Sequence, residues 1–190
     1  KPTIDRNLIH RQSLLDLLDQ GIERPLILVV APAGYGKSTA VCCWTETLSW
    51  PSAWVSLDDS DNELRLFLNW VIAAIHSIIP DACLNTLSLA TAITIPPVQA
   101  LANSLINELD WIEQRFTLVL DDFHLINNEA VFDFLTQLLL HPPQAMHLVL
   151  ICRRDPPLPI PKLRAGIWLS EIRTQDLRFD KMEISRFMAL

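Results

Sequence analysis

The run from Ala31 to Thr39, Ala-Pro-Ala-Gly-Tyr-Gly-Lys-Ser-Thr, has the residue types and the spacing of a loop that binds phosphate. Such a loop turns its backbone N–H groups toward phosphate oxygens, which needs glycine at the tightest bends and a helix N-terminus directed at the anion. Gly34 and Gly36 are two of only four glycines in the chain. Ala31 stands where the pattern usually has its first glycine, a mild departure. The run therefore predicts a binding loop for the phosphates of a nucleotide.

Three side chains at the end of this loop suit ATP or ADP with Mg²⁺. Lys37 can place its ammonium on the terminal phosphates, and the Ser38 hydroxyl can complete the coordination of Mg²⁺ that the phosphates hold. Thr39 is a further candidate phosphate contact. The remaining candidate nucleotide-binding residues belong to the loop itself: Ala33, Gly34, Tyr35 and Gly36. The alternative is an ordinary glycine-rich turn, but a buried strand before the loop and a helix after it favour nucleotide binding.

A pair of acids follows a second apolar run, Thr117-Leu-Val-Leu120. The run resembles a Walker B strand. An aspartate at the carboxyl end of such a strand can hold Mg²⁺ through water, and a second acid can orient the attacking water. Asp121 is thus the predicted metal-side residue, and Asp122 is the candidate catalytic base. The alternative, acids that merely cap a strand end, is less attractive because the phosphate loop is also present.

Adjacent arginines end a third apolar run, Leu148-Val-Leu-Ile-Cys152. Strand carboxyl ends point toward the ligand in open α/β sheets, so Arg153 is a candidate sensor of the γ-phosphate. The alternative is a solvated basic turn paired with Asp155. For Arg154 the solvated turn and a functional role are about equally good interpretations. For Arg153 the functional role is the better one.

Strand-like and helix-like segments alternate along the chain, the order that produces a parallel sheet covered by helices. We predict an α/β fold of the P-loop NTPase type, with a mainly parallel sheet of about five strands and helices on both faces. The strands are expected at 26–30, 53–57, 116–120, 147–151 and 167–172, and the helices at 13–20 (ended by Gly21), 37–48, 98–112 and 129–140. A further helix is expected from a cap at Asp61-Asn62 to Pro80, a loop over 81–97, and an extended connection through the prolines at 156–161.

Composition excludes several other classes of protein. The chain has 190 residues, half of them hydrophobic, which suffices for a core of one domain. No run approaches the roughly 20 apolar residues of a membrane span, and no secretory leader is visible, so we expect a cytoplasmic protein. The four cysteines lack CxxC spacing, which argues against a metal or disulfide framework. A net charge of −7 argues against direct binding of this chain to a nucleic-acid backbone.

Several segments together resemble the nucleotide-binding domain of the MalT-like, large LuxR-type transcriptional activators, which belong to the signal-transduction ATPases with numerous domains (STAND proteins). The matching segments are 8–14, 31–39, Trp54-Val-Ser-Leu-Asp-Asp-Ser-Asp-Asn62, Leu120-Asp-Asp-Phe-His-Leu-Ile126, 153–159, 163–166 and 171–179. The resemblance covers essentially the whole chain.

The resemblance implies an ATP-bound active state and an ADP-bound resting state, shifted by an inducer, with self-association in the ATP-bound state. It also implies that Ile9 and Arg11 contact the nucleotide on its adenine side, that Arg153 senses the γ-phosphate, and that Asp121 and Asp122 are the paired Walker B acids. His124 fits the family pattern, although a histidine packed at a strand edge is an equally good interpretation. DNA and the inducer would be bound by modules beyond Leu190.

The organisation expected from this likeness is a single nucleotide-binding domain over 1–190, as a fragment of a longer protein. It comprises an adenine-side segment and helix (1–25), the α/β core (26–172) and the start of a helical region (173–190). The expected activity is weak ATP hydrolysis that resets a regulatory switch. Two other functions stay open: a remodelling ATPase of the AAA-like group, which would need an arginine finger from a neighbouring subunit, and a P-loop fold that serves only as an interaction platform.

Overall fold

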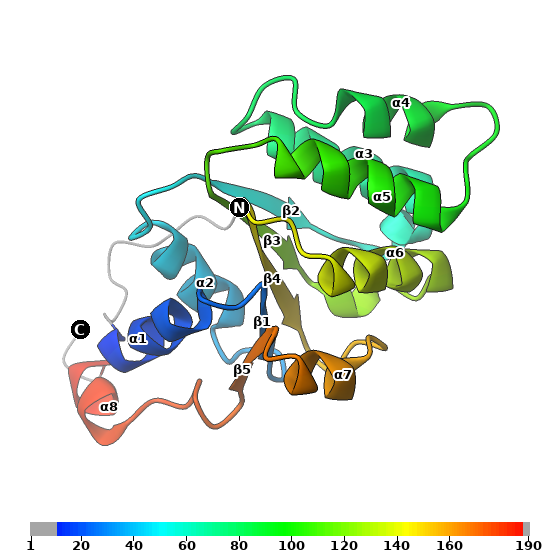
Figure 1. Cartoon of the computed structure of the whole chain (residues 1–190). Coiled ribbons are helices and arrows are strands. Elements are labelled where there is room, and N and C mark those ends of the chain that lie inside the picture. The colour runs from blue at the N-terminus through cyan, green and yellow to red at the C-terminus, as the bar shows by residue number, and fades with distance from the viewer. Residues whose placement is uncertain (1–10, 188–190) are drawn as a thin grey trace.

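A single five-stranded sheet forms the centre of the chain (Figure 1). The computed structural model describes residues 11–187. The strands are β1 (Leu26–Val30), β2 (Ser52–Ser56), β3 (Phe116–Asp121), β4 (Met146–Cys152) and β5 (Leu169–Arg173). They lie in the order β2-β3-β4-β1-β5, and every neighbouring pair is parallel. The predicted α/β class and the predicted number of strands are confirmed.

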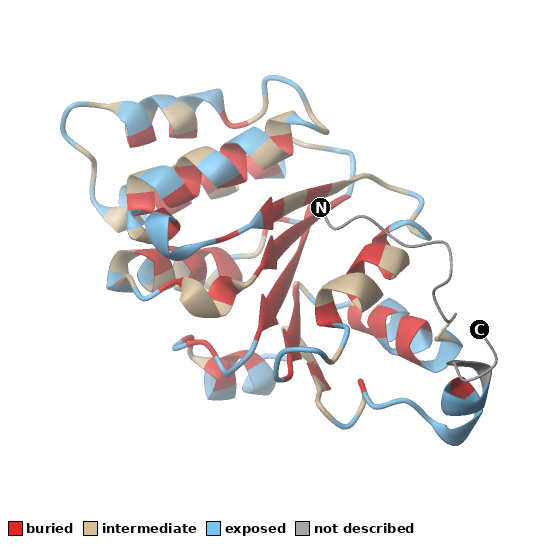
Figure 2. Cartoon of the chain, turned by 180° about the vertical axis from the view of Figure 1, so that it is seen from behind, coloured by how far each residue is buried: buried red, intermediate tan, exposed pale blue. Residues whose placement is uncertain are grey.

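Helices cover both faces of the sheet, as Figures 1 and 2 show. They are α1 (Gln12–Gly21), α2 (Lys37–Thr45), α3 (Leu64–His76), α4 (Leu84–Thr91), α5 (Val98–Asp110), α6 (Glu129–Leu140), α7 (Ile160–Ala165) and α8 (Lys181–Phe187). Two single turns of 3₁₀ helix, η1 (Asp59–Asn62) and η2 (Phe123–Leu125), follow β2 and β3. The helix predicted at 129–140 is confirmed to the residue, and the one predicted at 37–48 ends earlier, at Thr45.

Two cores form because alternate residues of a strand point to opposite faces of the sheet. In β1, Leu26 and Leu28 face the core under α3 to α7, whereas Ile27 and Val29 face the core under α1 and α2. The continuous apolar runs of the sequence are therefore strands that are buried on both faces, the usual arrangement in parallel sheets. The central strands β1, β3 and β4 are buried along their length, and in Figure 2 the red of the helices is mainly on the side toward the sheet.

The segment 81–97, which we expected to be a loop, contains helix α4. The reason is a contact from elsewhere in the chain. The Glu108 carboxylate in α5 accepts hydrogen bonds from the backbone N–H groups of Asn85 and Thr86, both at 2.8 Å. These donors belong to the first turn of α4, where a helix has no partners of its own. The helix start is thus capped by a residue that no local pattern points to.

Other boundaries also differ from the prediction. Asp61 and Asn62 lie in η1, which Asp58 caps, and α3 begins only at Leu64 and ends at His76. The proline-rich connection is not extended throughout, because Pro161 lies in the first turn of α7, where the missing N–H leaves no bond unmade. Gly21 ends α1 without a left-handed conformation: a Cβ there would lie 2.9 Å from Ile27 Cδ1, so close packing on β1 requires glycine.

Candidate functional site

Three neighbouring strands bring the predicted nucleotide-binding segments to one edge of the sheet. The strands β3, β4 and β1 are adjacent and parallel, so their carboxyl ends lie at the same edge. The loop 31–36 follows β1, Asp121 ends β3, and Arg153 follows β4. In open α/β sheets this edge is where ligands bind. The topology therefore brings together segments that are far apart in the sequence.

The loop after β1 has the backbone that its glycines predict. Gly34 and Gly36 have φ angles of 84° and 71°, which are strained for residues with a Cβ. A Cβ at either position would have no described atom within 4 Å, so conformation and not space requires glycine. Ala31, by contrast, is buried, does not have a positive φ, and donates a hydrogen bond through its N–H to Cys152 O at 3.3 Å. Alanine suffices there because Ala31 continues the pairing of β1 with β4.

The loop leads into α2, whose N-terminus suits an anion. Gly36 is the residue before the helix, and it has no side chain that could cap the N–H groups of the first turn. Unpaired N–H groups and the helix dipole together attract negative charge. Ala33 and Gly34 in the loop are exposed, and Tyr35 packs on the core under α1 and α2. Thr39 lies partly buried in the first turn of α2.

Lys37 is a buried cation at the centre of this edge. Its side chain is 8% exposed, and its Nζ donates a hydrogen bond to the Pro32 carbonyl at 3.0 Å. Burial lowers the pKa of the Lys37 ammonium, and the charge of Arg153 lowers it further, while Asp122 and Asp121 act in the opposite direction. A neutral carbonyl compensates a buried ammonium only in part. The surroundings of Lys37 thus favour the arrival of an anion.

Ser38 and Asp121 meet directly, although they belong to different elements. The Ser38 hydroxyl donates to Asp121 Oδ1 at 2.8 Å. Burial raises the pKa of the Asp121 carboxyl, and the hydrogen bond from Ser38 opposes that shift. A hydroxyl and a carboxylate are oxygen ligands, which Mg²⁺ prefers. No group of three or more His, Cys, Asp or Glu side chains that could hold a metal occurs within residues 11–187.

Asp122 and His124 lie in the turn after β3. Asp122 adopts a left-handed conformation (φ 55°), so its side chain departs from the line of the strand. The Nδ1 atom of His124 lies 3.7 Å from Asp122 Oδ1 and has no hydrogen-bond partner among the described residues. Burial lowers the pKa of His124, and Arg153 adds to the effect. A largely buried His124 therefore lies beside the acid that the sequence singled out as the base.

Arg153 and Arg154 are both exposed, and Arg153 is close enough to influence Lys37 and His124 electrostatically. Asp155, considered above as the partner of a basic turn, instead pairs with Arg173 at the end of β5. Sequence analysis did not single out Arg173. The sequence signal that could have identified Arg173 was its position at the carboxyl end of an expected strand. That strand, β5, lies beside β1.

Arg11 lies against the carboxyl-terminal part of the chain. Its Nε is 3.1 Å from Glu183 Oε1, its Nη2 donates to Arg178 O at 2.9 Å, and its guanidinium lies over the Phe179 ring at 4.7 Å. These contacts hold the guanidinium between α1 and α8. Ile9 lies outside the described residues. The adenine-side role of both residues stays a prediction.

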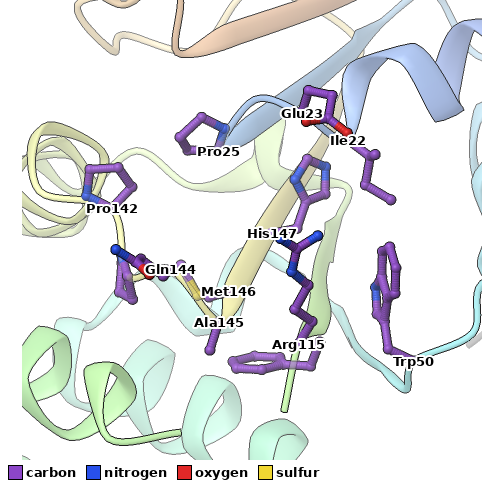
Figure 3. Close-up of a pocket in the computed structure, with 12 residues that line it drawn as sticks. Ile22, Glu23, Pro25, Trp50, Arg115, Pro142, Gln144, Ala145, Met146 and His147 are labelled. Carbon is purple, nitrogen blue, oxygen red and sulfur yellow. The ribbon is translucent and has the colours of Figure 1, made fainter. Parts of the chain in front are cut away.

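A separate cavity lies at the opposite edge of the sheet (Figure 3). It has a volume of about 270 Å³, and its lining includes Pro25, Phe116 and Met146, which lie just before or at the amino ends of β1, β3 and β4. Figure 3 shows the His147 ring beside the Arg115 guanidinium, with Trp50 nearby. This cavity is remote in topology from the phosphate loop and is not part of the predicted site.

Curated relatives match the chain over nearly its full length. The chain is 36% identical over 188 residues to the HTH-type transcriptional regulator MalT of Serratia proteamaculans, which is 98% of this chain and 21% of that protein. It is 35% identical over 182 residues to MalT of Vibrio parahaemolyticus, 95% of this chain and 20% of that protein. The chain thus spans about a fifth of the length of these relatives. No family model matches it.

Solved structures of low sequence identity share the fold of this chain. Cdc6p from Pyrobaculum aerophilum matches with a TM-score of 0.59 and 17% identity, over 98% of this chain and 52% of that one. The Walker-type ATPase of Pyrococcus abyssi matches with a TM-score of 0.57 and 12% identity, over 100% and 59%. At these identities the likeness concerns the fold alone.

Proposed function

We propose that this P-loop NTPase-fold domain, a relative of the MalT transcriptional regulators, is an ATP- and ADP-binding switch domain of a signal-responsive transcriptional activator. Hydrolysis of ATP would be slow, dependent on Mg²⁺, and would return the switch to its ADP state. The observation that carries the proposal is the contact of Ser38 with Asp121 at 2.8 Å, next to the buried ammonium of Lys37. A hydroxyl, a carboxylate and a lysine in this arrangement suit a nucleotide with Mg²⁺.

Each residue has a proposed task. The loop 33–36 and the start of α2 would bind phosphate oxygens through backbone N–H groups. The Lys37 ammonium would leave its hydrogen bond to the Pro32 carbonyl and bind the terminal phosphates instead. Ser38 and Asp121 would hold Mg²⁺, which when bound neutralises charge that develops on the phosphates. Asp122 would orient the attacking water and accept its proton. Arg153 would contact the γ-phosphate and so report whether ATP or ADP is bound.

The regulatory part of the proposal extends beyond the described residues. The relatives are transcriptional regulators of about five times this length, which supports modules for an inducer and for DNA elsewhere in such a protein. No helix within residues 11–187 is long and apolar enough to span a membrane. We place the protein in the cytoplasm and expect its ATP-bound form to self-associate. An inducer can shift such a switch only as far as it binds one nucleotide state more tightly than the other.

The first test is the nucleotide content of the purified protein. The protein is denatured, and the supernatant is separated by ion-exchange chromatography. ADP or ATP in stoichiometric amount supports the switch. Protein that emerges empty is then titrated with ADP or ATP and Mg²⁺ in a calorimeter. Absence of nucleotide binding in the full natural protein would refute the proposal and favour a role as an interaction platform.

A further inference from the structure

The segment 57–62, here called the β2 bracket, follows edge strand β2 and runs beside the turn that carries Asp122. Its first residue, Leu57, donates its N–H to Asp121 O at 3.0 Å and so extends the pairing of β2 with β3. The bracket then forms the turn η1, which Asp58 closes by accepting from Ser60 N at 2.7 Å. Its last residue is Asn62. The bracket is therefore fixed to the end of β3 at one side and closed by its own capping hydrogen bonds.

Asn62 ties the other end of the bracket to the chain beyond Asp122. Its Nδ2 donates to Leu125 O at 3.1 Å and to Asp59 O at 3.0 Å. Its Oδ1 accepts from Asn127 N at 2.6 Å, and its carbonyl accepts from Asn128 Nδ2 at 2.6 Å. Both amide donors and the amide oxygen are thus used. A side chain expected to cap a helix instead joins two loops that are some 60 residues apart in sequence.

The turn between these two anchors carries the candidate base. Asp122 is left-handed, and its carbonyl accepts from Leu125 N at 3.0 Å, the bond that closes η2. A left-handed non-glycine residue persists only where its surroundings hold it there. The buried Phe123 ring holds the middle of the turn, and Asn62 holds its exit at Leu125 and Asn127. Asn62 is therefore bonded to the chain at the exit of the turn that begins at Asp122.

We propose that Asn62 is a positioning residue for ATP hydrolysis, which acts by holding the turn that directs Asp122. This inference rests on the proposed function. The hydrogen bonds of Asn62 involve neither the phosphate loop nor the Ser38 and Asp121 pair. Loss of the Asn62 amide is thus expected to slow turnover and to leave nucleotide affinity nearly unchanged.

The test compares Asn62→Ala and Asn62→Asp with the wild type, in the full natural protein. Asn62→Asp keeps the shape and the acceptor for Asn127 N but replaces both donors by a carboxylate oxygen that repels the Asp59 and Leu125 carbonyls, so it tests these hydrogen bonds at nearly constant packing. Asn85→Ala is the matched control, because it removes a 2.8 Å hydrogen bond between α4 and α5 from Nδ2 to Ser104 Oγ. Three quantities are measured: Mg-ADP affinity, single-turnover hydrolysis of saturating Mg-ATP, and amide hydrogen exchange over 122–128.

Both Asn62 variants should hydrolyse ATP roughly tenfold more slowly, the factor that about 1.4 kcal/mol of barrier produces. Affinity should stay within about twofold, and exchange over 122–128 should be faster in Asn62→Ala. Unchanged turnover, a loss of affinity as large as the loss of turnover, or unchanged exchange over 122–128 each overturns the inference. If Asn62→Ala does not fold, Asn62→Asp decides by the same criteria. A wild type that neither binds nor hydrolyses ATP refutes the proposed function itself. An active wild type with Asn62 variants of equal activity refutes only the role of Asn62.

Discussion

Replacing Lys37 by alanine should have effects of opposite sign on the free and the nucleotide-bound protein. In the free protein the ammonium is buried with one neutral acceptor, Pro32 O at 3.0 Å, and burial lowers the Lys37 pKa. Removing an incompletely compensated buried charge relieves its desolvation. We expect the free energy of unfolding of the free protein to be unchanged or higher by up to about 1 kcal/mol, since the lost packing of the aliphatic stem offsets part of the gain.

Nucleotide binding should fall sharply in the same variant. A hydrogen bond to a charged group contributes about 1.5–3 kcal/mol, which corresponds to roughly a 10- to 150-fold change in affinity. The consequence for stability can be worked out. At a nucleotide concentration of 100 times the wild-type Kd, bound nucleotide stabilises the wild type by about 2.7 kcal/mol. With affinity lowered about 100-fold, the same concentration stabilises Lys37→Ala by only about 0.4 kcal/mol.

The assay is urea unfolding with and without Mg-ADP, supported by calorimetric titration. Lys162→Ala, which removes an exposed lysine from α7, is the matched control and should behave as the wild type in both conditions. A free Lys37→Ala protein that loses several kcal/mol would show that Lys37 is a structural residue. Unchanged affinity for Mg-ADP would reject the phosphate-loop assignment.

Two further predictions concern Asp122 and His147. Asp122→Asn should keep nucleotide affinity within about twofold, because asparagine tolerates the left-handed backbone, and should slow single-turnover hydrolysis by about 100-fold or more; equal turnover would exclude Asp122 as the base. Burial lowers the pKa of His147 from 6.5 to about 4, so between these values the unfolded state binds more protons and stability rises with pH, by about 3 kcal/mol in total. His147→Gln should remove that part of the pH dependence in urea unfolding from pH 4 to 7, and an unaltered slope would show that His147 does not titrate as described.

Much of the fold was predictable because its signals are local. The strands β1, β3 and β4 are continuous apolar runs, and burial on both faces of a parallel sheet is the common physical reason for such runs. The phosphate loop was predictable for a similar reason. The left-handed backbone at Gly34 and Gly36 needs glycine, so the conformation is visible in the residue types.

The errors arose where a distant residue decides the local structure. Helix α4 depends on the Glu108 carboxylate, which lies more than 20 residues further along the chain. Asp155, which the alternative interpretation paired with the neighbouring arginines, pairs with Arg173, because β5 lies beside β1 and brings Arg173 to the loop after β4. Asn62 has the residue type of a cap, but its amide finds better-placed partners at Leu125 and Asn127. Periodicity and capping rules describe near neighbours and could not identify these pairs.

Several exceptions to local rules lie at the carboxyl edge of the sheet, although positive φ angles and unpartnered buried atoms also occur elsewhere in the described chain. Lys37 is a buried cation with a neutral partner, Asp122 is left-handed without being glycine, and His124 Nδ1 is buried with no hydrogen-bond partner in the described chain. Arg153 lowers the pKa of both Lys37 and His124, which adds positive charge to the same place. Proteins usually violate such rules where function requires it. Asp121 and Asp122 compensate the charge of Lys37 only in part, and a polyphosphate with Mg²⁺ would compensate the charges of Lys37 and Arg153 together.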